Sequence, residues 1–538
     1  MNMKKIKSNE PFLGGCCAHS RRAFLTNCAK CVGAVGAIGA FSGLAIPTTI
    51  FANNSCTTSA AGMKIRVVFA LHTPVQDRPD WPNIGFDFNP VMETIMSSLI
   101  NGCRDVEFVS TMVDGREATE KLIAADNTAG NIDGYLVVQM NCWNQSVQQL
   151  CETGKPVLYA DFLYAGSGGF LTYTARLLNA NTSNFAFMSS GNFSHVVAAA
   201  NCFPLVKGAG GMKSFVDGVT KIRKDIVASV NVDMKCVNDE VELLSTKDLL
   251  NELKKKKILA FEGGGVFVQP IKDTLGIQLE LCKFAEVNDL WEKANKGQSM
   301  EVVNRWKKTS QEILDVSDET LEKSARFYLA MKQCLKNHDA CAITINCLGG
   351  FYGGHIQAYP CLGFHELLNE GLIGACECDI RSTLTEVVMT TMTKGRPGYI
   401  SDPVMDVEKK QIIYAHCVAS NKPFGPNKAS NPFTILTHSE DRKGASLRST
   451  LPVGYMTTTL EMNPIRKEIL FHQGKTVANS TQDRACRTKI AAVPVGDYEK
   501  LFTEWGRWDW HRVTYYGDLK KPVFDLANAI GWTIIEEA

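Results

Sequence analysis

From Met63 onward, short apolar runs alternate with helical stretches, and this alternation constrains the fold more than any other feature. The runs KIRVVFAL, DVEFVSTMV, DGYLVVQM and PVLYADF are typical of strands, and segments between them, such as REATEKLIAA, have helical periodicity. Strands that are apolar throughout and separated by amphipathic helices form parallel sheets covered on both faces. We therefore expect an α/β protein.

A second unit of the same kind follows, in which FAFMSS, KILAFEGG, CAITINC and IGACECDI are expected strands. Beyond about Thr393, Gly, Pro, Asn and Thr become frequent, and runs such as QIIYAHCVA and TTTLEM favour an antiparallel barrel or sandwich. A chain of 538 residues is also longer than a single hydrophobic core usually supports. The expected architecture is two Rossmann-like doubly wound α/β domains and a β-rich, barrel-like C-terminal domain, over residues 63–180, 181–392 and 393–538.

Two glycine-rich segments invite a nucleotide-binding interpretation. GSGGF, at Gly166 to Phe170, lacks the glycine spacing and the strand-to-helix placement of a dinucleotide-binding loop. FEGGG, at Phe261 to Gly265, is compatible with a phosphate cradle, but a tight turn after a strand explains it better. We expect structural roles for both.

The N-terminus carries an export pattern. SRRAFL, at Ser20 to Leu25, precedes a Gly- and Ala-rich apolar stretch and then Ala52, which together predict a twin-arginine signal peptide over residues 1–52. Cleavage after this segment predicts a periplasmic protein. An uncleaved anchor is the alternative, because the apolar stretch is about long enough to span a bilayer. We expect no membrane span in the mature chain.

The net charge of the chain bears on whether it binds nucleic acid. The formal net charge is only +1, so no global field attracts nucleic acid, and we expect no nucleic-acid partner.

Five of the 19 cysteines lie at or before Cys56. The other 14 are scattered through apolar runs, as buried free thiols usually are. Pairing of some of them in an exported protein is the alternative.

Acidic side chains near the end of the second unit are candidates for a functional site. Glu377 lies near the carboxyl end of the expected strand IGACECDI, where α/β folds place ligands. Asp379 has the same strand parity, so both carboxylates are expected on one face. Two such charges repel unless a cation lies between them or one keeps its proton. A solvated strand end explains the pair equally well.

Further donors follow along the chain. Asp402 precedes Pro403, His416 lies inside an apolar strand, and His511 is flanked by Trp508 and Trp510. Individually these are explained by turn chemistry, by a satisfied core histidine and by aromatic packing. Together with Glu377, they form a set of oxygen and nitrogen donors suited to one divalent cation such as Mn²⁺.

The order of these residues resembles that of the L-fucose isomerase and L-arabinose isomerase superfamily. The resemblance is specific from about Pro360 onward and is carried by PCLGFHELLNEGLIGACECD, CRTKI and WHRVTYYGDLKKPVFDLANAIGW. This chain departs from the family in being shorter than fucose isomerases and in carrying an export signal.

The resemblance implies a metal-dependent aldose–ketose isomerase that acts on a small-molecule sugar through a cis-enediol and assembles as a homo-oligomer. It implies that Glu377 and Asp402 bind Mn²⁺ and form the acid/base pair, with His511 and His416 as further metal ligands. The residues expected to contact the substrate are Asp379, His438, Arg487 and Trp510. Of these, Asp379 is expected to lie behind the metal ligands.

Two other functions fit the same sequence. Two α/β units with a cleft between them also form non-catalytic periplasmic sugar-binding proteins. Such a binder has no need for converging carboxylates and imidazoles or for a β-rich third part. The second alternative is another metal-dependent sugar-modifying enzyme, a hydrolase or epimerase, on the same scaffold. Product analysis separates an isomerase from both.

Overall fold

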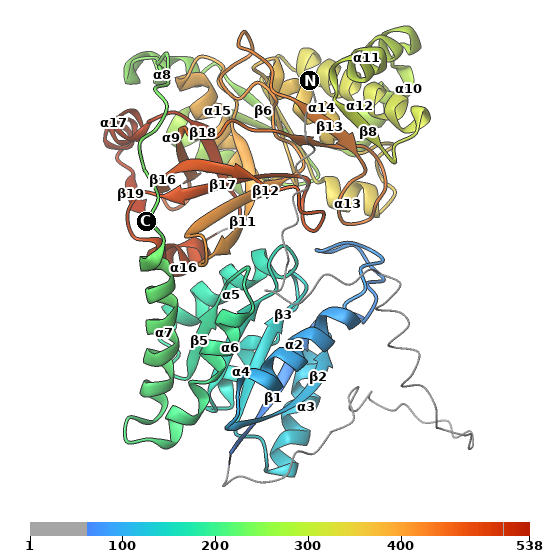
Figure 1. Cartoon of the computed structure of the whole chain (residues 1–538). Helices are drawn as coiled ribbons and strands as arrows, with labels where there is room; N and C mark the ends of the chain where they lie inside the picture. The colour runs from blue at the N-terminus through green and yellow to red at the C-terminus, as the bar shows by residue number, and fades with distance from the viewer. Residues whose placement is uncertain (1–61, 509) are drawn as a thin grey trace, which may run out of the picture.

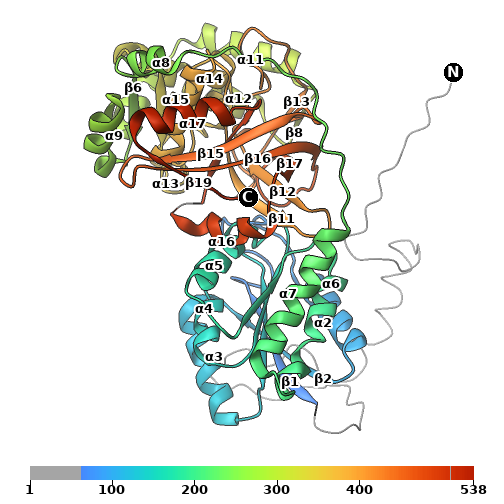
Figure 2. The same cartoon turned by 90° about the vertical axis from the view of Figure 1, so that its left-hand side faces the viewer.

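The computed structural model describes residues 62–508 and 510–538 (Figure 1). The expected signal peptide lies outside these residues. The described chain is a mixed α/β structure with two parallel sheets and a strand-rich C-terminal part, and it forms two lobes, shown from two sides in Figures 1 and 2. None of its described helices is long and apolar enough to cross a membrane.

The N-terminal lobe is built on a five-stranded parallel sheet of order β2-β1-β3-β4-β5. Its strands are β1 (Met63–Ala70), β2 (Val106–Val113), β3 (Gly134–Gln139), β4 (Val157–Asp161) and β5 (Phe185–Met188). Its helices are α2 (Asn89–Gly102), α3 (Gly115–Ala129), α4 (Val147–Glu152), α5 (Ser167–Asn179), α6 (Ser194–Ala200) and α7 (Gly211–Ser229).

Strand β5 corrects one expectation. FAFMSS was expected to open the second unit, but β5 pairs in parallel with β4, with Val157 opposite Phe185. The boundary expected at residue 180 therefore falls inside the first sheet. The reason is packing, because Phe185 and Phe187 are buried in the same core cluster as β1 and β3. Helix α7 then leads to the second lobe (Figure 2).

The second lobe contains a four-stranded parallel sheet of order β10-β9-β6-β7. Its strands are β6 (Lys257–Phe261), β7 (Gln278–Cys282), β9 (Ala342–Ile345) and β10 (Ile373–Ala375). The helices of this region are α8 (Thr246–Leu253), α9 (Val268–Leu275), α10 (Phe284–Lys293), α11 (Lys296–Thr309), α12 (Asp318–Asn337), α13 (Cys347–Tyr352), α14 (Cys361–Asn369) and α15 (Ile380–Met392). A small sheet joins β8 (Glu312–Leu314), β13 (Phe433–Leu436) and β14 (Ser446–Ser449).

The C-terminal strands form a closed ring. Their order is β15-β18-β11-β12-β17-β16, and β15 also pairs with β16. The strands are β11 (Tyr399–Asp406), β12 (Gln411–His416), β15 (Met456–Asn463), β16 (Glu468–Asn479), β17 (Thr488–Pro494) and β18 (Arg512–Tyr516), with β19 (Thr533–Glu536) added in parallel to β16. The helices α16 (Leu501–Glu504) and α17 (Lys520–Ile530) complete this part.

Both glycine-rich segments have structural roles in the described chain. Gly264, with φ 85°, is part of the turn after β6, where the left-handed backbone favours glycine. Gly169 lies in α5, which packs so closely on the loop after β3 that a Cβ atom at this position would lie 1.8 Å from the carbonyl oxygen of Cys142.

We expect Gly169→Ala to destabilise the protein, because the carbonyl it meets is backbone and cannot rotate away. Overpacking of this kind costs about 1–3 kcal/mol, occasionally more. The apparent melting temperature, followed by circular dichroism, measures the effect. Gly265→Ala is the control, since a Cβ there meets only Leu281 Cδ1, at 3.6 Å. Equal melting temperatures for the two variants would contradict this packing.

Candidate functional site

A cavity of about 300 Å³ lies between the N-terminal lobe and the second lobe, next to the C-terminal ring of strands. Trp81 and Trp143, which follow β1 and β3, line it from the N-terminal lobe. The opposite side is lined by Glu377, which follows β10, by Asp402 within β11, and by His416 and His511, which lie at the end of β12 and just before β18. The cavity therefore lies at the carboxyl ends of parallel strands, the usual place for ligands in α/β folds.

Glu377 reaches the cavity from a tight turn. Strand β10 ends at Ala375, so the expectation that Glu377 and Asp379 share one strand is wrong. Glu377 and Cys378 have φ values of 62° and 53°, a left-handed conformation that is uncommon for residues other than glycine. Asp379 then caps α15 by accepting hydrogen bonds from backbone N–H groups. Both residues still line the cavity, because a turn, in which the Asp379 N–H donates to Cys376 O at 3.2 Å, joins β10 to α15.

The pairing of β18, β11 and β12 gathers the other three donors. Asp402 lies on β11 opposite Ala415, next to His416 at the end of β12. On the other edge of β11, Ser401 is paired with Arg512, the residue after His511. Asp402, His416 and His511, which are far apart in the sequence, are therefore neighbours across three adjacent strands.

The donor atoms approach one another without forming hydrogen bonds. His511 Nε2 lies 3.5 Å from Asp402 Oδ1 and 3.8 Å from Glu377 Oε2, and His416 Nε2 lies 3.7 Å from Glu377 Oε1. Such distances exceed good hydrogen-bond lengths. Ligand atoms that each lie roughly 2.0–2.2 Å from one cation are about 3–4 Å from one another. The arrangement therefore fits a bound divalent ion.

The charges of the site also fit a cation. Burial raises the pKa of the Glu377 carboxyl to about 8, and the charge of Asp402 adds to this. Burial alone would lower the pKa of His511, but Asp402, Asp379 and Glu377 raise it to about 10. The site thus stabilises positive charge at His511. A divalent ion that displaces the His511 proton provides that charge instead.

Asp379 holds His511 in place. Its Oδ2 lies 2.9 Å from His511 Nδ1, and its Oδ1 accepts from the backbone N–H groups of Arg381 and Ser382 at 3.0 and 3.1 Å. Burial works to raise the pKa of Asp379, but the hydrogen bond from His511 overrides it and lowers the pKa. A carboxylate that accepts a hydrogen bond from Nδ1–H keeps the ring proton on Nδ1 and leaves the Nε2 lone pair free to bind a metal. This position behind His511 favours a supporting role over direct substrate contact.

From the expectation that His511 binds Mn²⁺, it follows that Asp379→Asn should weaken this binding by about 10–100-fold, the usual effect of losing the partner of a metal-binding histidine. Calorimetric titration of the variant with Mn²⁺ measures this. Asp441→Asn, which removes the equivalent partner of His438, is the matched control and should bind Mn²⁺ like the wild type. Wild-type affinity in Asp379→Asn would show that the Asp379 contact does not support a ligand.

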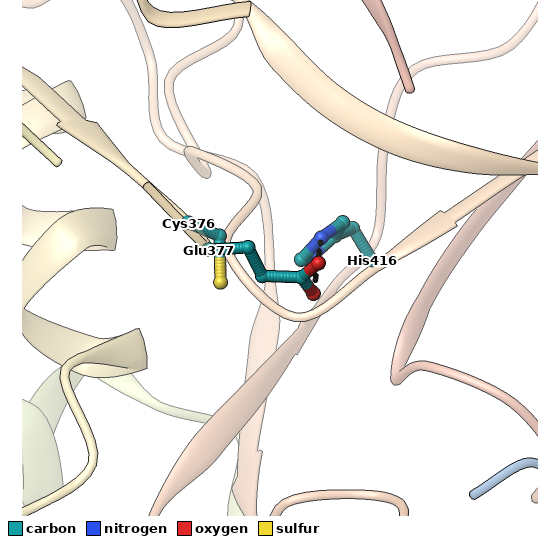
Figure 3. Close-up of side chains that lie close together, drawn as sticks. All are labelled: Cys376, Glu377 and His416. Carbon is teal, nitrogen blue, oxygen red and sulfur yellow. Dashed lines mark ion pairs between the residues drawn. The ribbon is translucent and has the colours of Figure 1, made fainter. Parts of the chain in front are cut away.

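His416 differs from His511 in its hydrogen bonds. Its Nδ1 accepts from the backbone N–H of Cys417 at 2.8 Å, so the proton of the neutral ring lies on Nε2. Within the described chain, His416 Nε2 is buried without a hydrogen-bond partner. Figure 3 shows the Glu377 carboxylate facing the His416 ring. A buried, unpartnered N–H group facing this cavity is suited to an oxygen acceptor on a ligand.

Of the residues expected on the substrate side, His438 and Trp510 line the cavity together with Asp379. The ring of Trp510 packs at 4.6 Å from that of Trp143. Arg487 is absent from the lining among the described residues, and its guanidinium donates to Thr437 O at 2.8 Å. Arg487 therefore supports the segment that carries His438.

Several cavity residues were not predicted from the sequence. Glu440 lines the cavity, accepts a hydrogen bond from the Tyr352 hydroxyl at 2.6 Å, and has a pKa that burial raises to about 8. Trp81 and Trp143 are a second case. Their position on the segments that follow β1 and β3 was the available signal, because ligand-binding residues often lie on such segments.

Comparison with known proteins gives distant relatives. No family model matches the chain. Sulfoquinovose isomerases of Priestia aryabhattai and Priestia megaterium are each 22% identical over 241 residues, covering 42% of this chain and 52% of theirs. The sulfoquinovose isomerase of Alkalicoccus urumqiensis is 28% identical over 107 residues, 20% of this chain and 24% of its own. This chain thus spans about half the length, or less, of the curated relatives it matches.

Solved structures give weaker likenesses. A solute-binding protein from Burkholderia multivorans is 9% identical, with a TM-score of 0.17, over 55% of this chain and 86% of its own. An arabinose-binding protein from Geobacillus stearothermophilus is 12% identical, with a TM-score of 0.16, over 57% of this chain and 86% of its own. Scores this low do not define a common fold.

Proposed function

We propose that this protein is a metal-dependent aldose–ketose isomerase that acts on a sugar through a cis-enediol. The observation that carries the proposal is the convergence of Glu377, Asp402 and His511, whose side-chain atoms approach to 3.5–3.8 Å in one cavity. The distant relatives named as sulfoquinovose isomerases support the same class of reaction.

The proposed ligands of a divalent cation such as Mn²⁺ are Glu377, Asp402 and His511. Mixed carboxylate and imidazole donors suit this ion. When bound, the cation supplies Lewis-acid polarisation of the sugar oxygens and keeps the two carboxylates ionised. His416 lies beside these residues, and the direction of its hydrogen bond from Cys417 favours donation to a sugar oxygen over metal ligation. The prediction that His416 binds the metal remains the alternative.

Glu377 and Asp402 form the proposed acid/base pair. In the open-chain aldose, one carboxylate takes the proton from C2, the electrons of that C–H bond form the C1=C2 double bond, and the C1=O1 π electrons move onto O1, which gains a proton to give the cis-enediol. Loss of the O2 proton then forms the C2=O2 carbonyl, and the electrons of the C1=C2 double bond take the carboxylate's proton back at C1. Burial, which raises the pKa of Glu377, places its proton affinity in the range needed for such transfers near neutral pH.

The walls of the cavity suggest how a sugar is held. Trp510 and Trp143 offer aromatic faces for the apolar C–H surface of a sugar ring. Arg381 and His438 also line the cavity, and the pKa of His438 is raised to about 9, against the effect of burial, mainly by its hydrogen bond to Asp441. These cationic side chains suit a sugar with an anionic substituent. Sulfoquinovose, a sugar with a sulfonate group, is therefore the first substrate to test.

The cellular location and the oligomeric state of the protein are also proposed. The twin-arginine pattern at Ser20 to Leu25 leads us to propose export and a periplasmic location. The family resemblance leads us to propose a homo-oligomer. Cell fractionation and light scattering of the purified protein test these two points.

The direct test of function is product analysis. We expect the purified protein to convert sulfoquinovose, or another aldose of a panel, to the corresponding ketose when Mn²⁺ is present, and to lose this activity with EDTA. Binding of a sugar without turnover would instead favour a sugar-binding protein. Products that contain added water, or are epimers, would point to another metal-dependent enzyme.

A further inference from the structure

Two thiols lie in contact at the edge of the cavity. Cys347 Sγ and Cys376 Sγ are 3.2 Å apart, and both side chains are buried. Cys347 begins α13 after β9, and Cys376 follows β10. Because β9 and β10 are parallel neighbours, the residues just beyond their carboxyl ends lie side by side. The contact therefore follows from the sheet.

This pair is joined to the proposed acid/base residue. Cys347 Sγ accepts the backbone N–H of Glu377 at 3.3 Å, and Cys376 is the residue before Glu377. Figure 3 shows the Cys376 thiol beside the Glu377 side chain, whose carboxylate faces His416. Glu377 occupies a left-handed turn, with φ 62°, and both cysteines are linked to this turn, Cys376 by a peptide bond and Cys347 by the hydrogen bond.

A small oxidant in the cavity has access to both sulfurs. Seven of the 14 free cysteines of the described residues line the cavity, namely Cys142, Cys347, Cys361, Cys376, Cys378, Cys417 and Cys486. Among these cavity cysteines, Cys347 and Cys376 have sulfurs 3.2 Å apart. A disulfide requires about 2.05 Å, so the two sulfurs need to approach by about 1 Å.

We propose that Cys347 and Cys376 form a reversible disulfide that displaces Glu377 and weakens the site. With hydrogen peroxide as the oxidant, one thiolate attacks a peroxide oxygen, the O–O bond breaks, and a sulfenic acid and hydroxide form. The second thiol attacks that sulfur and expels water. In total, two thiols and one peroxide give one disulfide and two water molecules. A dithiol reductant reverses the bond by thiol–disulfide exchange.

The consequence for the site follows from the hydrogen bond to Glu377. When Cys347 Sγ moves toward Cys376 Sγ, it moves relative to the Glu377 N–H, and the turn that aims the carboxylate shifts. The disulfide itself is independent of the proposed function. Its effect on Mn²⁺ affinity rests on the proposed function, and loss of an outer partner of a ligand typically costs about 10–100-fold.

The test treats the whole metal-free protein with a small excess of hydrogen peroxide, blocks the remaining thiols, and maps the peptides by mass spectrometry. We expect a cross-linked peptide pair containing Cys347 and Cys376, about 2 Da lighter than the two thiol forms because two hydrogens are lost. Dithiothreitol should remove it. Cys347→Ser should not form it, whereas Cys151→Ser, which changes a buried thiol outside the cavity lining, should form it like the wild type.

The second readout is calorimetric titration with Mn²⁺ before and after peroxide. We expect oxidation to weaken binding by about 10–100-fold in the wild type, with recovery in dithiothreitol and no change in Cys347→Ser. Absence of the cross-link overturns the proposal, and a cross-link that leaves Mn²⁺ affinity unchanged overturns its effect on the site. If the reduced protein binds no Mn²⁺, the proposed function fails, while the peptide map still decides on the disulfide.

Discussion

Glu377→Gln is expected to reduce isomerisation by roughly 10²–10⁴-fold, the usual contribution of a positioned proton-transfer group. The amide keeps the shape of the side chain but does not take a proton from carbon. Because burial disfavours the charged carboxylate, its neutral replacement should leave the folded state at least as stable. The measurement is the initial rate of ketose formation with Mn²⁺ present, together with the melting temperature of each protein.

The matched control for this variant is Glu370→Gln. Glu370, which follows the last residue of α14, forms an ion pair with Lys332 at 2.7 Å and lies outside the cavity lining among the described residues. Its variant should keep the wild-type rate. Glu377→Gln with a rate close to that of the wild type would remove Glu377 from the acid/base pair, and an equal loss in both variants would point to a general structural effect.

His511→Ala is expected to show the second large effect, a loss of Mn²⁺ affinity of about 100-fold or more, since even the outer partners of metal ligands contribute 10–100-fold. The Nε2 atom of His511 approaches both carboxylates, at 3.5 Å from Asp402 and 3.8 Å from Glu377, and Asp379 holds the ring in the orientation that frees it. Calorimetric titration with Mn²⁺ measures the change without reference to any substrate.

A histidine outside the cavity provides the comparison. His195 contacts the Ser190 hydroxyl at 2.8 Å in the N-terminal lobe, and His195→Ala should bind Mn²⁺ with wild-type affinity. Circular dichroism of both variants establishes that each is folded. Unchanged affinity in folded His511→Ala would mean that His511 is not a ligand, and the proposed metal site would lose its nitrogen donor.

The sequence predicted the sheets better than it predicted their limits. Alternating apolar runs and amphipathic helices identified the five strands of the first parallel sheet and β6, β9 and β10 of the second, because burial on two faces requires continuous apolar strands. Strand β7, at the edge of the second sheet, was not predicted, because only Leu279 and Cys282 of QLELC are buried. The run at Phe185–Met188 was assigned to the wrong unit, since an apolar strand has the same pattern in either sheet. Only the pairing with β4 separates the two cases.

The sequence predicted which residues form the site better than it predicted how they are arranged. The resemblance pointed to Glu377, Asp402, His416 and His511, and the structure brings their side chains together. Their proximity depends on the register of β18, β11 and β12, which no local pattern discloses. The turn at Glu377 was expected to be a strand, because its two left-handed residues are not glycines.

The cysteines illustrate what spacing alone cannot reveal. Cys347 and Cys376 belong to different βα connections, and nothing in the sequence pairs them among the 14 cysteines of the described chain. Their contact arises because β9 and β10 are neighbours in the sheet. The same holds for Glu440 and Trp143, which reach the cavity on loops from different lobes.

The measurement that tests the central claim most directly is a crystal structure of the protein grown with Mn²⁺, with the ion located by its anomalous scattering. We expect one Mn²⁺ in the cavity, roughly 2.0–2.6 Å from oxygens of Glu377 and Asp402 and from Nε2 of His511. A cavity without an anomalous peak at saturating Mn²⁺, or an ion bound elsewhere while these three side chains point apart, would contradict the account.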